Sequence, residues 1–264
     1  MITGIIIATV CVACVGLFIG VFLGIAGEKF KVEVDEREED IVNVLPGNNC
    51  GGCGYAGCSG LAAAIVKGEA PVGGCPVGGA LVAEKVAAIM GQEASQTVRM
   101  AAFVKCKGDC EKASSNYDYV GETSCTMLKF VPSGGPKKCS WGCLGGGDCV
   151  KACSFGAISI INGIAVIDSD KCKACGSCVA ACPRQLIEMV PYDSNVRVAC
   201  SSKDKGPIVM KACTVGCIGC MLCQKNCPNG AISVTDSLAK IDYDKCTKCG
   251  ICAEKCPKGA ITVD

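Results

Sequence analysis

Cysteine is the residue type with which this chain could do chemistry, because 27 of its 264 residues are cysteines and most recur at short, regular intervals. Three runs share the spacing C-x2-C-x2-C-x3-C-P, and they begin at Cys172, Cys217 and Cys246. Thiolates at this spacing hold [4Fe–4S] clusters, with the first three cysteines on one cluster and the fourth on its neighbour. The runs therefore predict electron transfer through clusters, and a four-cysteine zinc site is the weaker alternative.

The runs belong to an internal repeat. Adding 74 to the positions of eight cysteines in residues 139–190 gives eight cysteines in residues 213–264. The register has one gap, because Gly146 stands where the second copy has Cys220, and we take Cys139 as the replacement ligand. The crossing rule then predicts four clusters. Their ligands are Cys139, Cys143, Cys149 and Cys182; Cys153, Cys172, Cys175 and Cys178; Cys217, Cys220, Cys223 and Cys256; and Cys227, Cys246, Cys249 and Cys252.

A separate motif nearer the N-terminus predicts a fifth cluster. Cys50, Cys53 and Cys58 lie within nine residues and alternate with glycines, and Cys75 follows before a proline. Glycines between cysteines let backbone amides turn toward the sulfurs, as in the anion-binding nests of iron–sulfur sites. Zinc is again the alternative, but it usually takes two separated pairs of cysteines.

Five further cysteines outside the apolar N-terminal segment are enough to supply the four ligands of a sixth cluster. They are Cys106, Cys110, Cys125, Cys200 and Cys213. Cys125 and Cys200 precede the two copies at nearly equivalent places, and Cys106 shares a Val-x-Cys context with Cys200. Free buried thiols are the alternative. The sequence thus predicts five or six [4Fe–4S] clusters and leaves the ligand set of the sixth open.

Short elements must position these ligands. Apolar spacing and alanine content predict helices over 59–67 and 80–90, and Gly-Ala-Ile triplets at 156–158, 230–232 and 259–261 predict the starts of strands. We expect an α+β protein with one N-terminal transmembrane helix, a small helical four-cysteine domain and tandem bacterial ferredoxin-like domains of βαββαβ type. The expected parts are a membrane anchor (1–27), a charged linker (28–40), the four-cysteine domain (41–91), a connecting segment with extra cysteines (92–138), ferredoxin-like domain 1 (139–190), a connector (191–212) and ferredoxin-like domain 2 (213–264).

Residues 1–27 carry no charged side chain and are long enough to cross the hydrocarbon core as a tilted helix. A cleaved signal peptide is the alternative, but its basic start and short apolar region are both missing. Gly16, Gly20 and Gly24 lie on one face of this helix and would let a partner helix approach closely. Lys29 and Lys31 favour a cytoplasmic location for the rest of the chain, as does the need to keep thiolates reduced.

Composition excludes several classes of function. The chain has no histidine, which rules out Ser-His-Asp and Cys-His nucleophilic sites and mixed Cys/His zinc sites. Its formal net charge of +1 counts thiols as neutral, so cluster-bound thiolates would make the protein acidic. The lysines are scattered without interleaved aromatic residues, which argues against nucleic-acid binding. Four of them flank cluster cysteines, where they would attract an acidic redox partner or be ordinary solvated charge: Lys171, Lys173, Lys245 and Lys248.

The order of these features resembles the B subunit of Rnf-type ion-translocating ferredoxin:NAD oxidoreductases. The similarity rests on the uncharged glycine-rich anchor, the NNCGGCGYAGC motif, the VKCKGDC segment and the ferredoxin runs, and it covers essentially the whole chain. The doubled unit is similar to the longer, cluster-rich forms of that protein. The resemblance implies an electron-transfer subunit without catalytic side chains, which accepts electrons from soluble reduced ferredoxin.

The resemblance further implies that the chain spans the cell (inner) membrane once, with its soluble part in the cytoplasm. It would relay electrons to other membrane and flavin-bearing subunits, partly through the Gly16/Gly20/Gly24 face. No dinucleotide fingerprint and no context for a covalent flavin are found, so flavin and NAD are expected on partner subunits. Two other functions stay open at this point: a cluster relay of another membrane oxidoreductase, such as a hydrogenase module, and a membrane-tethered redox sensor.

Overall fold

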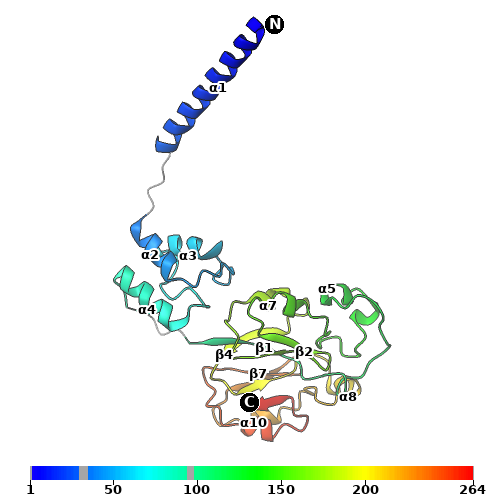
Figure 1. Ribbon diagram of the computed structural model, residues 1–264. Helices are drawn as coiled ribbons and strands as arrows, with labels where there is room; N and C mark the ends of the chain where they lie inside the picture. Colours follow the sequence, from blue (N-terminus) through cyan, green and yellow to red (C-terminus); the bar gives the residue numbers. More distant parts are fainter. Residues whose placement is uncertain (1, 30–34, 94–97, 264) are drawn as a thin grey trace.

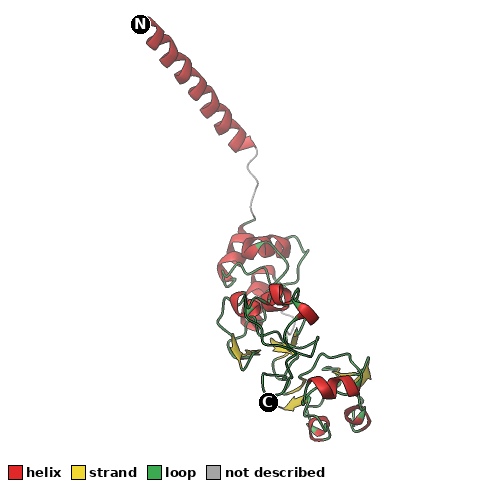
Figure 2. Cartoon of the chain, turned by 90° about the vertical axis from the view of Figure 1, so that its right-hand side faces the viewer, coloured by secondary structure: helices red, strands yellow, loops and turns green. Residues whose placement is uncertain are grey.

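The computed structural model describes residues 2–29, 35–93 and 98–263, and it contains both helices and strands. Figure 1 shows three parts along the chain: helix α1, a helical unit formed by α2 to α4, and a larger part that carries the strands of the described residues. In both views α1 lies at one end of the molecule, and the C-terminal half of the strand-bearing part lies toward the other end (Figures 1 and 2).

Helix α1 spans Ile2–Lys29, and its segment Val10–Lys29 is long and apolar enough to cross a membrane. None of that segment is buried against the rest of the described chain. A Cβ placed on Gly16, Gly20 or Gly24 would meet no atom within 4 Å, so the glycine face is open to a partner helix. The linker predicted at 28–40 lies in part outside the described residues.

Three helices form the unit next to α1: α2 (Glu36–Val44), α3 (Gly57–Val66) and α4 (Gly79–Met90). The helices predicted over 59–67 and 80–90 are therefore confirmed. Ile41, Leu61 and Val86 are fully buried where the helices meet, and each such side chain contributes about 1.5–3 kcal/mol by leaving water. Helix α4 ends at Gly91, whose φ of 64° is left-handed and suits glycine.

The strand-bearing part consists of two halves with the same pattern of strand pairing. In the first half, β1 pairs antiparallel with β4, which places Val104 opposite Ile187, and β2 forms a hairpin with β3. The elements of this half are β1 (Met100–Val104), α5 (Cys125–Leu128), the 3-10 turn η1 (Pro132–Gly134), α6 (Asp148–Lys151), β2 (Ile158–Ile161), β3 (Ile164–Ile167), α7 (Ser177–Ala181) and β4 (Ile187–Pro191).

In the second half, β5 pairs antiparallel with β8, and β6 forms a hairpin with β7. Strands β2, β6 and β8 begin at or directly after the three Gly-Ala-Ile triplets, as predicted. The elements of this half are β5 (Val196–Val198), α8 (Gly206–Ala212), α9 (Leu222–Lys225), β6 (Ile232–Thr235), β7 (Leu238–Ile241), α10 (Ile251–Glu254) and β8 (Ile261–Val263).

The first strand of each half lies in a segment that we expected to be a connector. Strand β1 falls within 92–138 and β5 within 191–212, because a lone short strand has little periodic signal and is fixed by the strand it pairs with. The Lys105 N–H donates to the Leu186 carbonyl at 2.8 Å, and the Ala199 N–H donates to the Ala260 carbonyl at the same distance. The two first strands therefore enter their halves in equivalent ways.

Cysteine side chains take part in the cores of both halves, in a chain with only 5% aromatic residues. Cys143, Cys149 and Cys178 are buried among the apolar residues of the first half, and Cys200, Cys223 and Cys252 are buried in the second. Each core is thus built around candidate ligands, whose sulfurs lie where a conventional domain would have larger apolar groups.

Candidate metal centres

Three of the predicted four-cysteine groups line pockets of their own. In each group the third cysteine of the run lies in the short helix after the Cys-x2-Cys turn, in α7, α9 and α10 respectively. We name them site 2 (Cys153, Cys172, Cys175 and Cys178), site 5 (Cys217, Cys220, Cys223 and Cys256) and site 6 (Cys227, Cys246, Cys249 and Cys252). The structure gathers these cysteines as the crossing rule groups them, and cluster binding there stays a prediction.

The first half departs from the predicted grouping at Cys139. The side chain that joins Cys143, Cys149 and Cys182 around a pocket, here named site 3, is that of Cys125. A Cβ on Gly146 would lie 2.9 Å from the Cys125 Sγ. Because Gly146 is the repeat equivalent of Cys220, the Cys125 sulfur fills the space that the Cys220 side chain takes in the second half. The grouping of Cys139 with these three cysteines is therefore corrected.

Asp148 holds the turn that carries Cys125. Its Oδ2 accepts hydrogen bonds from the Thr126 N–H and the Thr126 hydroxyl, both at 2.9 Å, and from the Ser124 hydroxyl at 3.1 Å. Burial opposes ionisation of Asp148, but these donors outweigh it and keep the pKa of the carboxyl below its ordinary value. Leu222 stands at the equivalent position of the second half, where Cys220 of the run takes the place of Cys125 and no extra turn needs an anchor.

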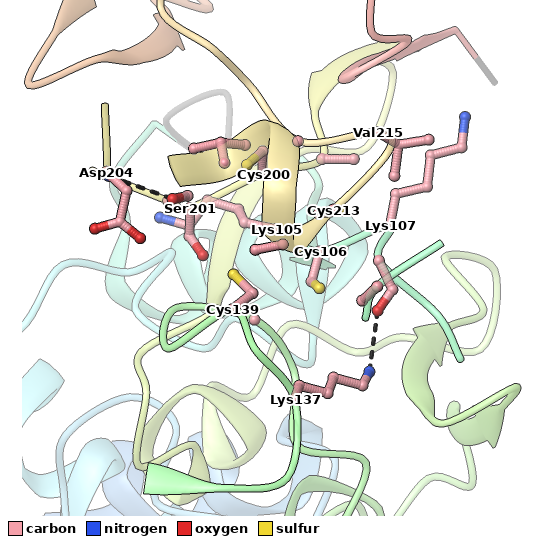
Figure 3. Close-up of a pocket in the computed structure, with 18 residues that line it drawn as sticks. Lys105, Cys106, Lys107, Lys137, Cys139, Cys200, Ser201, Asp204, Cys213 and Val215 are labelled. Atoms are coloured by element: carbon pink, nitrogen blue, oxygen red, sulfur yellow. Dashed lines mark hydrogen bonds between the residues drawn. The ribbon is translucent and has the colours of Figure 1, made fainter. Parts of the chain in front are cut away.

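Cys139 belongs to a group that the sequence did not specify. Cys106, Cys139, Cys200 and Cys213 line a pocket between the two halves, here named site 4, and Figure 3 shows them around it. The Cys143 N–H donates to the Cys106 Sγ at 3.3 Å, and its repeat equivalent, the Cys217 N–H, donates to the Cys200 Sγ at the same distance. Site 4 is therefore built from two equivalent pairs, Cys106 with Cys139 and Cys200 with Cys213.

Two sequence signals, taken together, could have identified site 4. Cys139 and Cys213 match in the repeat, and Cys106 and Cys200 share the Val-x-Cys context. Of the candidates for the sixth cluster, only Cys110 lines none of the pockets of sites 2 to 6. Its Sγ lies close to Gly163, at the turn between β2 and β3. Cys11 and Cys14 are exposed on α1, apart from every candidate site.

The glycine-rich motif forms site 1 (Cys50, Cys53, Cys58 and Cys75) beside the core of the helical unit. Cys53, Cys58 and Cys75 pack against that core, and Cys50 precedes Cys53 in the same loop. Burial raises the pKa of the Cys75 thiol, the amides of Gly78 and Val77 lower it, and the nearby Cys58 and Cys53 raise it. The effect of Cys53 and Cys58 on Cys75 is consistent with the packing of all three beside the same core.

The loop of site 1 is held by Asn49. Its Oδ1 accepts the Cys58 N–H at 2.8 Å, so the side chain bridges the two ends of the motif. A Cβ on Gly57 would lie 2.7 Å from the same oxygen, and the φ of Gly57 is +86°. The glycine between Ala56 and Cys58 is therefore required both by the close approach of Asn49 and by the backbone conformation.

Among the described residues, no three Cys, His, Asp or Glu side chains come together in a way that could hold a single ion. Backbone N–H groups also point at sulfurs in sites 1 to 5, at 3.3 to 3.4 Å, as is expected for cluster ligands.

Burial makes isolated thiolates unfavourable in these groups. It raises the pKa of Cys149 to about 12, and nearby cysteines of site 3 raise it further. It likewise raises the pKa of Cys178, Cys200 and Cys223 to about 11. Positive metal ions reverse this balance by neutralising the thiolates. Without a metal centre, these cysteines are therefore poor nucleophiles.

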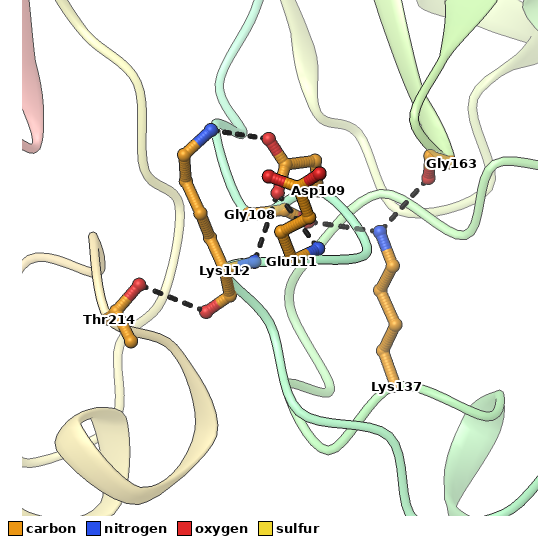
Figure 4. Close-up of polar contacts among 7 residues, drawn as sticks. All are labelled: Gly108, Asp109, Glu111, Lys112, Lys137, Gly163 and Thr214. Atoms are coloured by element: carbon orange, nitrogen blue, oxygen red, sulfur yellow. Dashed lines mark hydrogen bonds and ion pairs between the residues drawn. The ribbon is translucent and has the colours of Figure 1, made fainter.

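A buried lysine lies beside sites 3 and 4. The Lys137 ammonium donates to the Gly108 carbonyl at 3.0 Å and to the Gly163 carbonyl at 2.9 Å, and the residue is only 7% exposed (Figure 4). Burial raises the pKa of Cys143 in site 3 and of Cys213 in site 4, and Lys137 acts in the opposite direction on both. One cation therefore influences two neighbouring sites, a feature that the sequence did not reveal.

Arg184 is a second cation between the same two sites. Its guanidinium donates to the carbonyls of Cys139, Gly142 and Gly134, so it ties the loop of site 4 to the segment that follows Cys182 of site 3. Burial lowers the pKa of Arg184, and cysteines of both sites act in the opposite direction. Its charge thus lies within reach of both sets of sulfurs.

Three family models match the parts of the chain that carry these sites. A family described as a putative Fe-S cluster matches residues 45–77, a 4Fe-4S binding domain matches 165–188, and a 4Fe-4S dicluster domain matches 216–260. The first match falls on site 1, the second on the Cys172 run, and the third on sites 5 and 6.

Curated relatives match over most of the chain. The protein is 44% identical over 236 residues, 89% of each chain, to the B subunit of the ion-translocating oxidoreductase complex of Methanosarcina acetivorans. It is 45% identical over 232 residues to the B subunit of the Na⁺-translocating ferredoxin:NAD⁺ oxidoreductase complex of Acetobacterium woodii, with 88% of this chain and 69% of the relative covered. It is 45% identical over 244 residues to the B subunit of the proton-translocating ferredoxin:NAD⁺ oxidoreductase complex of Clostridium ljungdahlii, with 92% and 86% covered.

Proposed function

This chain belongs to the B-subunit family of Rnf-type ion-translocating ferredoxin:NAD oxidoreductases, and we propose that it carries electrons through six [4Fe–4S] clusters, one at each of sites 1 to 6. Its general role, an iron–sulfur electron-transfer subunit of such an enzyme, follows from the family and from the 4Fe-4S domains. We further infer that the two halves are bacterial ferredoxin-like domains, and that β1 and β5 are their first strands.

One observation carries the proposal of a relay: the six sites form a continuous row. Gly52, next to Cys53 of site 1, lies against Cys175 of site 2, and a Cβ on Gly52 would be 2.5 Å from the Cys175 carbonyl oxygen. Sites 2 and 3 adjoin through α6 and α7, which pack on each other, and sites 5 and 6 adjoin through α9 and α10 in the same way.

Site 4 joins the two halves of this row. The amide of Cys143, a site 3 residue, donates to the sulfur of Cys106 in site 4. The amide of Cys217, a site 5 residue, donates to the sulfur of Cys200, also in site 4. Without site 4 the row would be interrupted between the halves, so the position of this group supports six clusters rather than five.

The chain contributes positions and surroundings to this function. A bound [4Fe–4S] cluster supplies one-electron chemistry, with a potential set by charge, hydrogen bonds and burial. The cysteines fix each cluster, the amides that point at the sulfurs stabilise negative charge, and Lys137 and Arg184 add positive charge near sites 3 and 4. No side chain is assigned a role in making or breaking a substrate bond.

We propose a direction for the row from the position of α1. Site 1 belongs to the helical unit that follows α1, whereas sites 5 and 6 lie in the half toward the other end (Figure 1). Soluble reduced ferredoxin would donate electrons at the distal half. Membrane and flavin-bearing subunits would accept them near site 1 and pack on the Gly16/Gly20/Gly24 face.

The soluble part would be cytoplasmic, because Lys29 ends the apolar helix and thiolate ligands suit a reducing compartment. Flavin and NAD would be bound by the partners.

Anaerobic iron and sulfide analysis of the full chain tests the six-cluster proposal. We expect about 24 irons per chain, from six clusters of four. Cys200→Ser should lower the count by about four irons, whereas Cys110→Ser should leave it unchanged, because Cys110 lies outside all six groups. A wild-type count of about 20, with no loss in Cys200→Ser, would show that site 4 holds no cluster.

The relay role is tested separately, by mixing the oxidised chain with reduced ferredoxin under anaerobic conditions. The visible absorbance of the clusters should be bleached, because electrons enter them from the donor. Full bleaching by dithionite together with no bleaching by ferredoxin would overturn the proposed donor.

A further inference from the structure

Each ferredoxin-like half has a cysteine-bearing turn at an equivalent position, and the two turns differ in whether another part of the chain covers them. In the first half, the turn of residues 172–176 carries Cys175, which is partly buried beneath Gly52 of the helical unit. The equivalent turn of the second half, residues 246–250, carries Cys249, which is exposed. The face that receives another cluster-bearing unit in the first half is thus open in the second half of the described chain.

The unit that covers Cys175 shows what kind of partner this face accepts. It carries site 1 in a glycine-rich loop and brings that loop into backbone contact with the Cys175 turn. Residues 36–91, which form this unit, hold six acidic and three basic side chains. The molecule therefore contains an example of an acidic iron–sulfur unit packed on a ferredoxin-like half, with the two candidate centres adjacent.

The two turns carry their lysines at different positions: Lys173 of the first half stands where the second half has Thr247, and Lys248 lies directly before the exposed Cys249. Lys248 stands where the first half has Ala174, and both residues have a left-handed backbone, with φ of 60° and 55°. The Lys248 side chain is exposed, whereas the nearby Lys245 is engaged with Asp242 at 3.2 Å. Lys248 thus places a positive charge beside the exposed Cys249, where it would attract a negatively charged partner.

We propose that the turn of residues 246–250 is the docking surface for an acidic soluble ferredoxin, so that site 6 is where electrons enter the row. This inference rests on the proposed function, since it names the site that the ferredoxin donor uses. In the first half, the helical unit with site 1 covers the Cys175 turn. A ferredoxin docked at residues 246–250 would cover the equivalent turn of the second half. A contact of this type is small and short-lived, and its association rate depends on charge.

Site 5 also has an exposed ligand, Cys220, but it is a weaker place for entry. Exposed Met221 and Leu222 follow Cys220, so its border is apolar. In the first half the equivalent region is filled by the Cys125 turn and not by a cluster-bearing unit. Entry at site 5 would also leave site 6 off the path to the membrane, whereas entry at site 6 uses the whole row.

A charge-reversal pair tests the proposal in the full chain. Lys248→Glu should lower the second-order rate constant for reduction by ferredoxin about tenfold at low ionic strength, and the difference should shrink as salt is added. Lys225→Glu is the matched control, because Lys225 is exposed in α9 beside site 5 and undergoes the same change of charge. Both variants should keep the iron content of the wild type and bleach fully with dithionite.

The outcomes separate this proposal from the proposed function. An unchanged rate in Lys248→Glu, or an equal or larger loss in Lys225→Glu, would overturn docking at the Cys249 turn. Failure of the wild-type chain itself to accept electrons from ferredoxin would instead overturn the proposed donor.

Discussion

Lys137 shows how a single side chain distinguishes the two copies of the repeat. In the first half its ammonium is buried beside sites 3 and 4, but the repeat equivalent, Lys211, is exposed on α8. A buried charge is screened less than an exposed one, so we expect Lys137 to act more strongly than Lys211 on nearby sulfurs. Positive charge favours the reduced form of a cluster, so we expect clusters at sites 3 and 4 to accept electrons more readily than a cluster at site 5.

We predict that Lys137→Met lowers the reduction potential of one or two clusters. The shift should be about 59 mV, which is a tenfold change in the equilibrium of a one-electron couple. Redox titration followed by electron paramagnetic resonance checks this, and Lys211→Met is the control that should shift nothing. Equal shifts in the two variants would show that the buried position of Lys137 has no special effect.

A pair of double variants tests which cysteines share a site. Cys125→Ser with Cys143→Ser changes two ligands of site 3, so the chain should lose about four irons. Cys139→Ser with Cys143→Ser changes one ligand each in sites 4 and 3, so the loss should be about eight irons. Iron analysis decides between them, and the opposite order would restore Cys139 to the group with Cys143, Cys149 and Cys182.

At the scale of elements, the first half takes one of the four cysteines of site 3, Cys125, from an added segment. The chain between Cys106 and Cys139 is much longer than the chain between Cys200 and Cys213, and it contains α5 with Cys125. Because α5 is only four residues long, it cannot be stable alone. Its position depends on the hydrogen bonds that Asp148, at the start of α6, accepts from residues 124–126.

Asp148→Leu should therefore loosen site 3 specifically. The substitution introduces the residue found in the second half and removes three hydrogen bonds to Asp148, which should cost about 1–3 kcal/mol of unfolding free energy. Thermal unfolding measures this loss, and a chelator challenge should release about four irons early. Thr126→Val removes only the hydroxyl donor and should have a smaller effect; an equal effect of both would argue against Asp148 as the anchor.

On the scale of the whole molecule, the helical unit and the two strand-bearing halves meet so that the six candidate centres form one row. The junction between the helical unit and the first half depends on Gly52, which lies directly against the Cys175 backbone. Site 4, in contrast, is a property of neither half, because each half supplies two of its cysteines. The row of candidate centres is thus made by interfaces between units as much as by the units themselves.

Gly52→Ala should slow electron flow into site 1 without removing a cluster. The new methyl group would overlap the Cys175 carbonyl, so the two units must move apart, whereas Gly60→Ala places its methyl at an ordinary 3.7 Å from Tyr55. Iron content should be unchanged in both. Stopped-flow measurement in the assembled complex should show a severalfold slower transfer to the partner subunits only for Gly52→Ala. An unchanged rate would show that this contact is not on the path.

The sequence by itself determined the chemistry, the repeat and the family, because each ferredoxin run and the site 1 motif bring three cysteines together through local turns of fixed spacing. It also predicted α3, α4 and the strand starts, which depend on local apolar patterns. Tertiary structure alone decided which cysteines line the pockets of sites 3 and 4, the buried place of Lys137, and the pairing of β1 with β4 and of β5 with β8. These depend on segments far apart in the chain, and neither cysteine spacing nor periodicity carries information about which distant segments meet.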